Sequence, residues 1–395
     1  MKNDKIKSIF NSTLLFVIAF SIPFYNLSII NRSPIFFIFI FVLVIFFTGF
    51  MNIKKKYPLE LVILLFLCLY KIFSISWSID PAHTKEVVFN TSIPLLVMTF
   101  FFYNLIKDIN DLNFIFKIYI FACFIFSLFV FSAYSSRPED IILNLGNSQI
   151  TFLETNPTEV SFFMLYGIIF LIYFESYKKI NNIFISLLIL TFITTILLSG
   201  SRTGFANLIL IIFYIFFIKR SLFWFLSTLL FVFIIYYLVS NLLSSEVISR
   251  YSNIINIFSK VHPSFYQEGY RGWNWNTGLS LFFDRGLFYQ IFGIGYEVYG
   301  TLIQEGVGRG SSHHNQMLGY FVELGIIGLV INLILFTKIF KKVFIISKYY
   351  SSNFFLFLIP TYSYLFFTGF DAKFFFYFFI IIMIKLHKFS IIEKN

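Results

Sequence analysis

The sequence contains very little charge for its length. Of its 395 residues only 12% are charged and 58% are apolar, whereas an ordinary soluble domain has about 25% charged residues. Its 61 Phe and 24 Tyr residues would make a soluble surface aggregate. The composition therefore excludes a water-soluble enzyme, a disordered chain and a nucleic-acid-binding domain, in spite of a net charge of +11. It predicts an integral membrane protein with many spans.

Cysteine and histidine are also scarce. The two cysteines, Cys68 and Cys123, lie inside apolar runs and do not support a disulfide scaffold. The chain has five histidines, and the adjacent pair His313 and His314 has no cysteine or acid cluster nearby. Adjacent histidines rarely hold one ion together, so we expect no metal site and no cofactor. The first apolar stretch lacks a small-residue cleavage site and is interpreted as a retained first span.

Long apolar runs predict twelve transmembrane helices, because one span needs about 20 predominantly apolar residues. The predicted spans are residues 12–30, 35–53, 59–76, 87–106, 114–134, 158–174, 183–199, 204–218, 222–243, 316–336, 352–370 and 373–386. Three charged residues within or beside these runs, Glu60, Lys71 and Lys117, lie near predicted span ends, where long side chains can snorkel to the membrane surface. We expect no catalytic role for them.

Lysine is concentrated in every second connection between the predicted spans. Seven basic clusters contain 18 of the 30 Lys and Arg residues. They are Lys2/Lys5/Lys7, Lys54–Lys56, Lys107, Lys178/Lys179, Lys219/Arg220, Lys338/Lys341/Lys342/Lys348 and Lys385/Lys388/Lys394. The positive-inside rule places such clusters in the cytoplasm. Both termini are therefore predicted to be cytoplasmic.

Arginine has the opposite distribution. Seven of the eight arginines fall in predicted outer segments: Arg32, Arg137, Arg202, Arg250, Arg271, Arg285 and Arg309. A guanidinium group is a planar, permanently charged fork that binds phosphate through two hydrogen bonds. This bias favours phosphate-rich ligands at the outer surface. The alternative is that single arginines pair with outer acids or lipid headgroups.

The longest connection divides the chain into three parts. Residues 1–243 contain predicted spans one to nine, residues 244–315 form a long outer loop, and residues 316–395 contain spans ten to twelve and the cytoplasmic C-terminus. Within the loop, residues 279–292 are apolar but too short for a span, which favours an interfacial helix. We expect the loop to form a folded cap over the outer ends of the bundle.

Two motifs in predicted outer segments contain arginine beside other polar groups. Residues 199–204 read SGSRTG, a short turn in which Arg202 is accompanied by hydroxyl and amide donors that suit a phosphate. An ordinary interfacial turn is the alternative. Arg271 begins RGWNWN, where Trp273 and Trp275 alternate with asparagines. These tryptophans are suited to stack on sugar rings, although Trp is also common at membrane interfaces.

A third motif, RGSSHHNQMLGYFVELGIIGLV, leads from Arg309 into predicted span ten. His314 and Asn315 directly precede the span, and histidine is the side chain best suited to proton transfer near neutral pH. Gln316, Gly319 and Glu323 would share one helix face. Glu323 lies about two turns deep, where an acid needs a partner facing the interior. A structural hydrogen bond and a catalytic role are both open for this carboxylate.

In this order, the motifs resemble the O-antigen polymerase and O-antigen ligase superfamily, which comprises Wzy-type polymerases and lipopolysaccharide ligases. The similar segments are SGSRTGF (199–205), YRGW (270–273), FGIGYEVYG (292–300) and HNQMLGYFVELGIIG (314–328). The resemblance implies a GT-C-like bundle and a metal-independent glycosyltransferase in the bacterial inner membrane. Its donor would be a glycan linked to undecaprenyl pyrophosphate, and its partners would be lipid-linked donor and acceptor, membrane lipids and a chain-length regulator protein, with no nucleic acid.

Site roles follow from the chemistry that the resemblance implies. We expect Arg202 and Arg271 to bind the pyrophosphate leaving group and His314 to activate or orient the acceptor hydroxyl. Asn315 and Glu323 would support them, and Trp273 would contact sugar. Lesser candidates are Arg285, Arg309, His313 and Asp371.

The sequence is compatible with three functions. A polymerase, which we favour, transfers the growing glycan onto another lipid-linked repeat unit, whereas a ligase transfers it onto lipid A-core. A lipid-linked oligosaccharide flippase is the alternative from another class. Transporters usually place charges near the bilayer midplane and show two related halves. The predicted midplanes here are almost free of charge, and no internal repeat is visible.

Overall fold

The computed structural model describes residues 2–24, 57–136, 157–177, 182–219, 271–307, 315–349, 352–367 and 374–392, with the single residues Leu226, Leu230, Phe233 and Tyr237. Within them the regular secondary structure is helical and no strand is present, which confirms an all-α protein. The chain divides into two compact units. Unit 1 comprises Met1–Ser33, Lys107–Lys260 and Ile346–Ser363, and unit 2 comprises Pro34–Ile106, Val261–Ile345 and Tyr364–Asn395.

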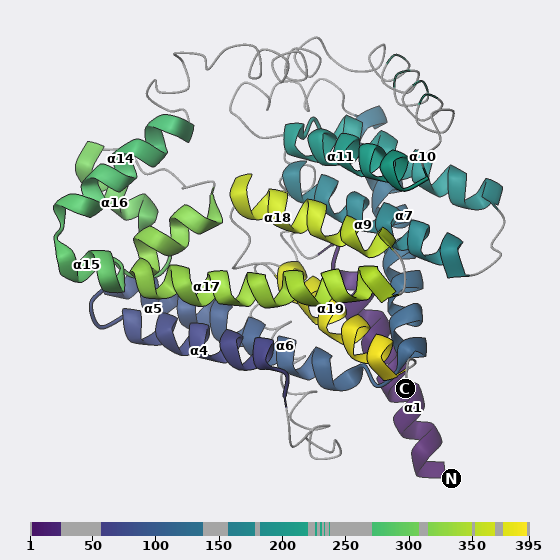
Figure 1. Ribbon diagram of the computed structural model, residues 1–395, viewed down its shortest axis with the longest axis horizontal. Helices are drawn as coiled ribbons and strands as arrows, with labels where there is room; N and C mark the ends of the chain where they lie inside the picture. Colours follow the sequence, from purple (N-terminus) through teal and green to yellow (C-terminus); the bar gives the residue numbers. More distant parts are fainter. Residues whose placement is uncertain are drawn as a thin grey trace. The chain divides into compact units, whose positions relative to one another are not determined.

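Unit 1 is built around helix α9 (Pro157–Tyr177). Its other elements are α1 (Lys2–Ser21), α7 (Ile109–Ser136), α10 (Asn182–Leu198), α11 (Arg202–Lys219), the 3-10 helix η4 (Ser352–Phe357) and the first part of α18 (Leu358–Phe367). Helix α9 packs against α7, α10, α11 and η4 (Figure 1). Every residue from Glu159 to Leu171 is buried. A helix that is apolar on all sides is stable only when neighbours cover all of it, and α9 satisfies this condition.

Aromatic contacts and one shared hydroxyl hold α9 in place. Phe116 of α7 stacks on Phe170, with ring centroids 4.2 Å apart. The Tyr166 hydroxyl donates to the backbone carbonyl of Phe357 over 3.2 Å and contacts the hydroxyl of Thr361. A buried hydroxyl without a partner would cost about 1–3 kcal/mol, so these contacts fix the side of α9 that faces η4 and α18.

Unit 2 contains α4 (Leu59–Ser74) and a continuous helical run made of α5 (Pro81–Val87), the π-helix η1 (Val88–Ser92) and α6 (Ile93–Leu105). It also contains α14 (Arg271–Asp284), α15 (Leu287–Phe292), α16 (Tyr299–Val307), most of α17 (Gln316–Tyr349) and α19 (Phe374–Ile392). Helix α6 packs against both α4 and α19 (Figure 1). Phe102 of α6 stacks on Phe378 of α19, with centroids 4.9 Å apart.

The predicted outer loop is folded where it is described. Helices α14, α15 and α16 lie within it, and α14 packs against both of the others. A hydrophobic cluster joins them to α17: Phe282, Ile294, Val298, Tyr299, Leu302, Ile303 and Val322. The predicted single helix over 279–292 is instead divided between α14 and α15. Gly286 separates them with φ 91° and ψ 173°, a conformation that is essentially restricted to glycine.

Helix α17 is broken at Gly325, where φ is 67° and ψ is −169°. The carbonyls just before such a break have no partner within the helix. Those of Val322 and Glu323 instead accept the backbone N–H groups of Ile294 (3.1 Å) and Gly295 (3.0 Å). The carbonyl of Ile294 in turn accepts the N–H of Ile79 over 2.8 Å. The break therefore joins α17, the segment after α15 and the segment before α5 through backbone hydrogen bonds.

Two glycines allow this close approach. A Cβ atom added at Gly293 would lie 2.2 Å from the carbonyl oxygen of Glu323, and one at Gly325 would lie 2.2 Å from the carbonyl oxygen of Ile291. Both glycines also have positive φ, 83° and 67° respectively. Because the atoms that would clash are backbone atoms, no change of rotamer relieves the clash. Glycine is required at both positions for two independent reasons.

Buried charges in unit 2 are partnered. The Lys385 ammonium donates to the carbonyl of Ile106 and lies 4.0 Å from the ring centroid of Tyr103. Glu60 of α4 and Lys342 of α17 form an ion pair of 3.0 Å. Glu60 was expected to snorkel but is only 2% exposed. Because the Glu60 side chain is almost entirely removed from water, the pair with Lys342 replaces contact with water.

Three helical runs in the described residues are long and apolar enough to cross a membrane: Pro81–Leu105, Ile109–Ser132 and Gln316–Lys348. Shorter apolar helices occur at Asn11–Ser21, Thr158–Tyr173, Ile183–Leu198, Arg202–Ile215 and Phe354–Ser363. Predicted span 35–53 and most of 222–243 lie outside the described residues. The helices support a membrane protein, while the number of twelve spans, their orientation and the GT-C-like arrangement stay predictions.

Alanine at the two contact glycines tests the importance of the α17 break. We expect Gly293→Ala and Gly325→Ala each to lower the melting temperature of the purified protein in detergent more than Gly286→Ala does. Gly286 has an equally strained φ but no atom within 4 Å of its added Cβ, so it reports the conformational cost of about 1–3 kcal/mol alone. Equal melting temperatures for all three variants would show that the backbone contacts contribute nothing.

Candidate functional site

The SGSRTG motif forms the turn between α10 and α11 in unit 1. Gly200 has φ 65° and allows the reversal. Ser201 caps α11: its hydroxyl oxygen accepts the N–H of Gly204 (3.0 Å), and its carbonyl accepts the N–H of Phe205 (3.0 Å). Serine at this position satisfies N–H groups that a helix leaves open at its start. Arg202 is the first residue of α11 and its side chain is exposed.

The serine hydroxyls in this turn are used inside the protein. Ser199 is fully buried and donates to the carbonyl of Ile196 over 2.7 Å. Ser201 is 4% exposed, and its hydroxyl lies 3.0 Å from that of Ser161 on α9. Of the hydroxyl groups in the turn that was expected to suit a phosphate, those of Ser199 and Ser201 are therefore buried. Arg202 and Thr203 are the polar side chains of the motif that the turn leaves at least partly exposed.

In unit 2, Asn315 directly precedes the broken helix α17 and caps its start. Its side-chain oxygen accepts the N–H of Leu318 over 3.1 Å, and its carbonyl accepts the N–H of Gly319 over 2.9 Å. This is an N-terminal cap of the kind that asparagine prefers. The predicted residues His313 and His314 directly precede this cap in sequence but lie outside the described residues. Asn315 thus has a structural role in orienting the start of the helix.

Glu323 is buried at the end of the short half of α17. It is 1% exposed, and its carboxylate oxygen accepts the backbone N–H of Tyr299, the first residue of α16, over 3.2 Å. A carboxylate at a helix N-terminus is favourable because the N–H groups there carry partial positive charge. Gln316 and Gly319 are buried too, which confirms that their shared face points into the protein. The structural interpretation of Glu323 therefore has a direct observation in its favour.

Tyr299 extends this connection to α14. Its hydroxyl donates to the backbone carbonyl of Asn274 over 2.6 Å. Burial raises the pKa of the Tyr299 hydroxyl, and the nearby Glu323 carboxylate raises it further, so it remains a hydrogen-bond donor over the physiological range of pH. Asn274 lies one turn after Arg271, the first residue of α14. The start of α14 is thereby tied to Glu323 through one tyrosine.

The other predicted site residues are only partly described by the structure. The backbone of Arg271 is helical, while its side chain lies outside the described part of the structure; Trp273 is half-buried on α14. Arg285 forms an ion pair with Glu305 of α16. Arg309, His313, His314 and Asp371 lie outside the described residues. Among described residues, no group of three His, Cys, Asp or Glu side chains is arranged to hold a metal ion.

Sequence reasoning missed the role of Lys71 and Tyr296. Lys71 of α4 was expected to snorkel, but it is 1% exposed, and its Nζ atom lies 3.7 Å from the ring centroid of Tyr296. Thr84 of α5 donates to the carbonyl of Tyr296 over 3.1 Å. The segment 293–298 is therefore held on the α4 and α5 side as well as by α17. The sequence feature that marks this segment is the FGIGYEVYG motif, in which Gly293 and Gly295 flank the buried Ile294.

The segment that contains these features is similar to a known protein family. Residues 185–333 match the family model described as O-antigen ligase. The match confirms the resemblance to the O-antigen polymerase and ligase superfamily. It covers the Arg202 turn, α14 to α16 and the break in α17. Members of this family are membrane glycosyltransferase-like enzymes in polysaccharide and lipopolysaccharide assembly. Among curated proteins, the sequence has no significant match.

Substitutions at Glu323 separate its structural role from a chemical one. Glu323→Gln keeps an oxygen that accepts the Tyr299 N–H, so we expect a melting temperature and glycan-transfer activity close to those of the wild type. Glu323→Ala leaves that buried N–H without an acceptor, at a cost of about 1–3 kcal/mol, and should lower both. Melting temperature in detergent and glycan transfer are measured on the same preparations. Loss of activity in a stable Glu323→Gln protein would instead assign the carboxylate to the chemistry.

Proposed function

We propose that this protein is a surface-polysaccharide polymerase that joins repeat units carried on undecaprenyl pyrophosphate at the outer face of the bacterial inner membrane. The family match over residues 185–333 is the observation that supports it most strongly. The apolar helices and the arginine bias of the predicted outer segments agree with it. The alternative within the same family is a ligase that transfers the finished glycan onto lipid A-core.

The proposed reaction needs one leaving group and one nucleophile. The acceptor sugar hydroxyl attacks the anomeric carbon of the donor glycan, a new C–O bond forms, and the bond to the lipid pyrophosphate breaks. Negative charge develops on the departing pyrophosphate oxygen, and a well-placed donor to such a charge contributes about 3–4 kcal/mol. We assign this role to the guanidinium groups of Arg202 and Arg271, because a fork of fixed charge matches a diphosphate.

The acceptor hydroxyl is neutral at physiological pH and loses its proton during attack. We assign the acceptance of this proton, or the orientation of the hydroxyl, to His314, because a general base contributes roughly 10²–10⁴-fold to such a step. The N-terminal cap by Asn315 and the hydrogen bond from Tyr299 to Glu323 support the short helix that follows His314. Trp273 is proposed to contact sugar. Arg285 and Arg309 are lesser candidates for binding the donor.

Conservative arginine substitutions test the assignment. In a strain that lacks the native gene, we expect each of three variants to restore less than about a tenth of the long surface glycan at wild-type protein level. In Arg202→Lys and Arg271→Lys, lysine retains the charge but not the planar fork. In His314→Ala, the side chain that accepts the proton or orients the hydroxyl is removed. Arg220→Lys, an equal change in a predicted cytoplasmic cluster, should restore it fully. The measurement is a gel of the surface glycan with protein level from the membrane fraction. Normal glycan length in all three site variants would overturn the assignment.

The deletion strain separates the two family functions. Core bearing a single repeat unit would identify a polymerase, because ligation continues without chain growth. Bare core with lipid-linked polymer left in the membrane would identify a ligase and contradict our choice. A flippase would strand single repeat units on the cytoplasmic side, where enzymes added to sealed, right-side-out vesicles do not reach them.

A further inference from the structure

An apolar groove of about 390 Å³ lies among α7, α9 and α10 of unit 1. Its volume is within the range of roughly 300–1,000 Å³ that is typical of ligand sites. Its lining is Lys117, Ile120, Phe121 and Phe124 of α7, Leu171 of α9, and Phe184, Ile185 and Leu188 of α10. Seven of these eight residues are apolar. The α7 members follow the i, i+3, i+4, i+7 spacing of one helix face, so the groove runs along α7.

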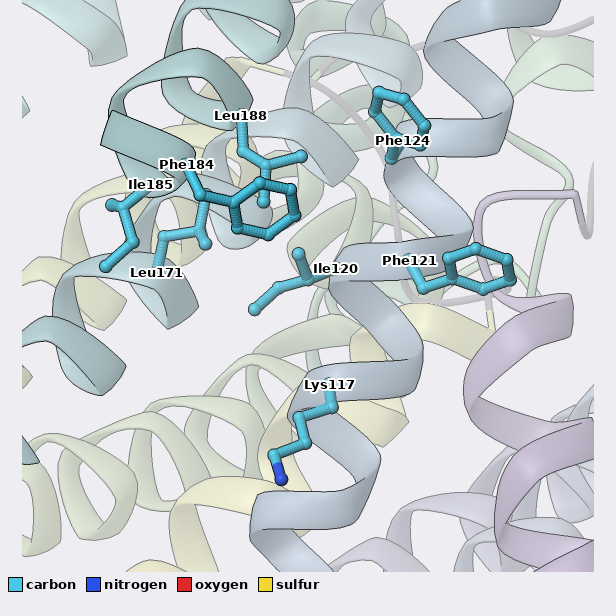
Figure 2. Close-up of a pocket in the computed structure, with 8 residues that line it drawn as sticks. All are labelled: Lys117, Ile120, Phe121, Phe124, Leu171, Phe184, Ile185 and Leu188. Atoms are coloured by element: carbon cyan, nitrogen blue, oxygen red, sulfur yellow. The ribbon is translucent and has the colours of Figure 1, made fainter. Parts of the chain in front are cut away.

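Lys117 is the one charged residue in this lining and stands at one end of the groove. Figure 2 shows its nitrogen directed away from Ile120 and Phe121, along α7 toward the start of that helix. The side chain is exposed, and within the described part of the chain no hydrogen bond or salt bridge to it is found. Ile109 begins α7, so Lys117 lies about 12 Å along the helix axis. Its flexible side chain can reach back toward the membrane surface.

The groove therefore has an apolar lining along its length and one cation, Lys117, at the end nearer the start of α7. This is the complement of an acyl chain that ends in an anionic headgroup. An apolar helix of a second protein would leave the charge of Lys117 without a partner. A zwitterionic lipid would place its own cationic group near Lys117, which is less favourable than an anionic headgroup. Helix α7 is one of the helices long and apolar enough to cross a membrane, so lipid chains are what this face would meet.

We propose that the groove binds one anionic phospholipid, with an acyl chain along Ile120, Leu171 and Leu188 and the phosphate beside Lys117. The basic residues Lys107 and Lys178/Lys179, which precede α7 and follow α9 in sequence, predict that this end faces the cytoplasm. The lipid would therefore come from the inner leaflet. The proposed glycan donor would have its pyrophosphate at the opposite face, so the site is distinct from the proposed catalytic residues.

Native mass spectrometry of the full chain in detergent tests this proposal. Phosphatidylglycerol and phosphatidylcholine with identical acyl chains are the probes. We expect the wild-type protein to retain one phosphatidylglycerol at least about fivefold more tightly than phosphatidylcholine, which is the preference that one lysine near a membrane surface confers. Lys117→Gln should remove this preference, and Lys117→Arg should keep it. Lys341→Gln, an exposed basic residue outside the groove lining, is the matched control.

A second variant tests the apolar part of the site. Ile185→Trp fills the groove and should weaken retention of both lipids, whereas Lys117→Gln affects only the anionic one. A preference that persists in Lys117→Gln, or no preference in the wild type, would overturn the proposal. Displacement of the bound lipid by equimolar undecaprenyl pyrophosphate would assign the groove to the donor instead. A change in oligomeric state without a change in lipid binding would assign it to a second copy of the chain.

Discussion

The break in α17 at Gly325 is the constraint on which the described part of the predicted outer loop depends. It leaves the carbonyls of Val322 and Glu323 available to the N–H groups of Ile294 and Gly295, and Gly293 and Gly325 let the two backbones approach. Each hydrogen bond contributes only about 1 kcal/mol. Their combination with glycine-only conformations, however, admits one register. Residues 323–325 (ELG) and 293–295 (GIG) thus form the two sides of a single backbone interaction.

The same break also bears on the proposed site residues. It limits the first half of α17 to a short helix between the Asn315 cap, which directly follows His314 in sequence, and Gly325. Glu323 binds the start of α16, and Tyr299 of α16 binds the carbonyl of Asn274 in the first turn of α14, which Arg271 begins. One hydrogen-bonded path therefore connects two of the motifs that resemble the glycan polymerase and ligase superfamily. Rigid support of this kind is what a site needs to stabilise a developing charge.

Composition was sufficient to predict the helical class and a membrane protein, and the order of the polar motifs was sufficient to predict the resemblance that the family model matches over residues 185–333. Helix periodicity also placed Gln316 and Glu323 on one face of a helix, and both are buried in the structure. Hydropathy could not reveal that Lys71 turns inward onto Tyr296, because an apolar run with one lysine has the same pattern whether that lysine snorkels or is buried. The division of 279–292 at Gly286 and the use of Ser199 and Ser201 within their own turn depend on backbone conformation, which residue type alone does not specify.

The most direct test of the account is glycan transfer by the purified protein in liposomes that contain lipid-linked repeat units and no ion gradient. We predict longer lipid-linked glycans and free undecaprenyl pyrophosphate as products. We also predict that the Arg202→Lys, Arg271→Lys double variant is about as slow as the slower single variant, because groups that act on one leaving group are not additive. Absence of product with the wild-type protein, or rate losses that multiply in the double variant, would contradict the account.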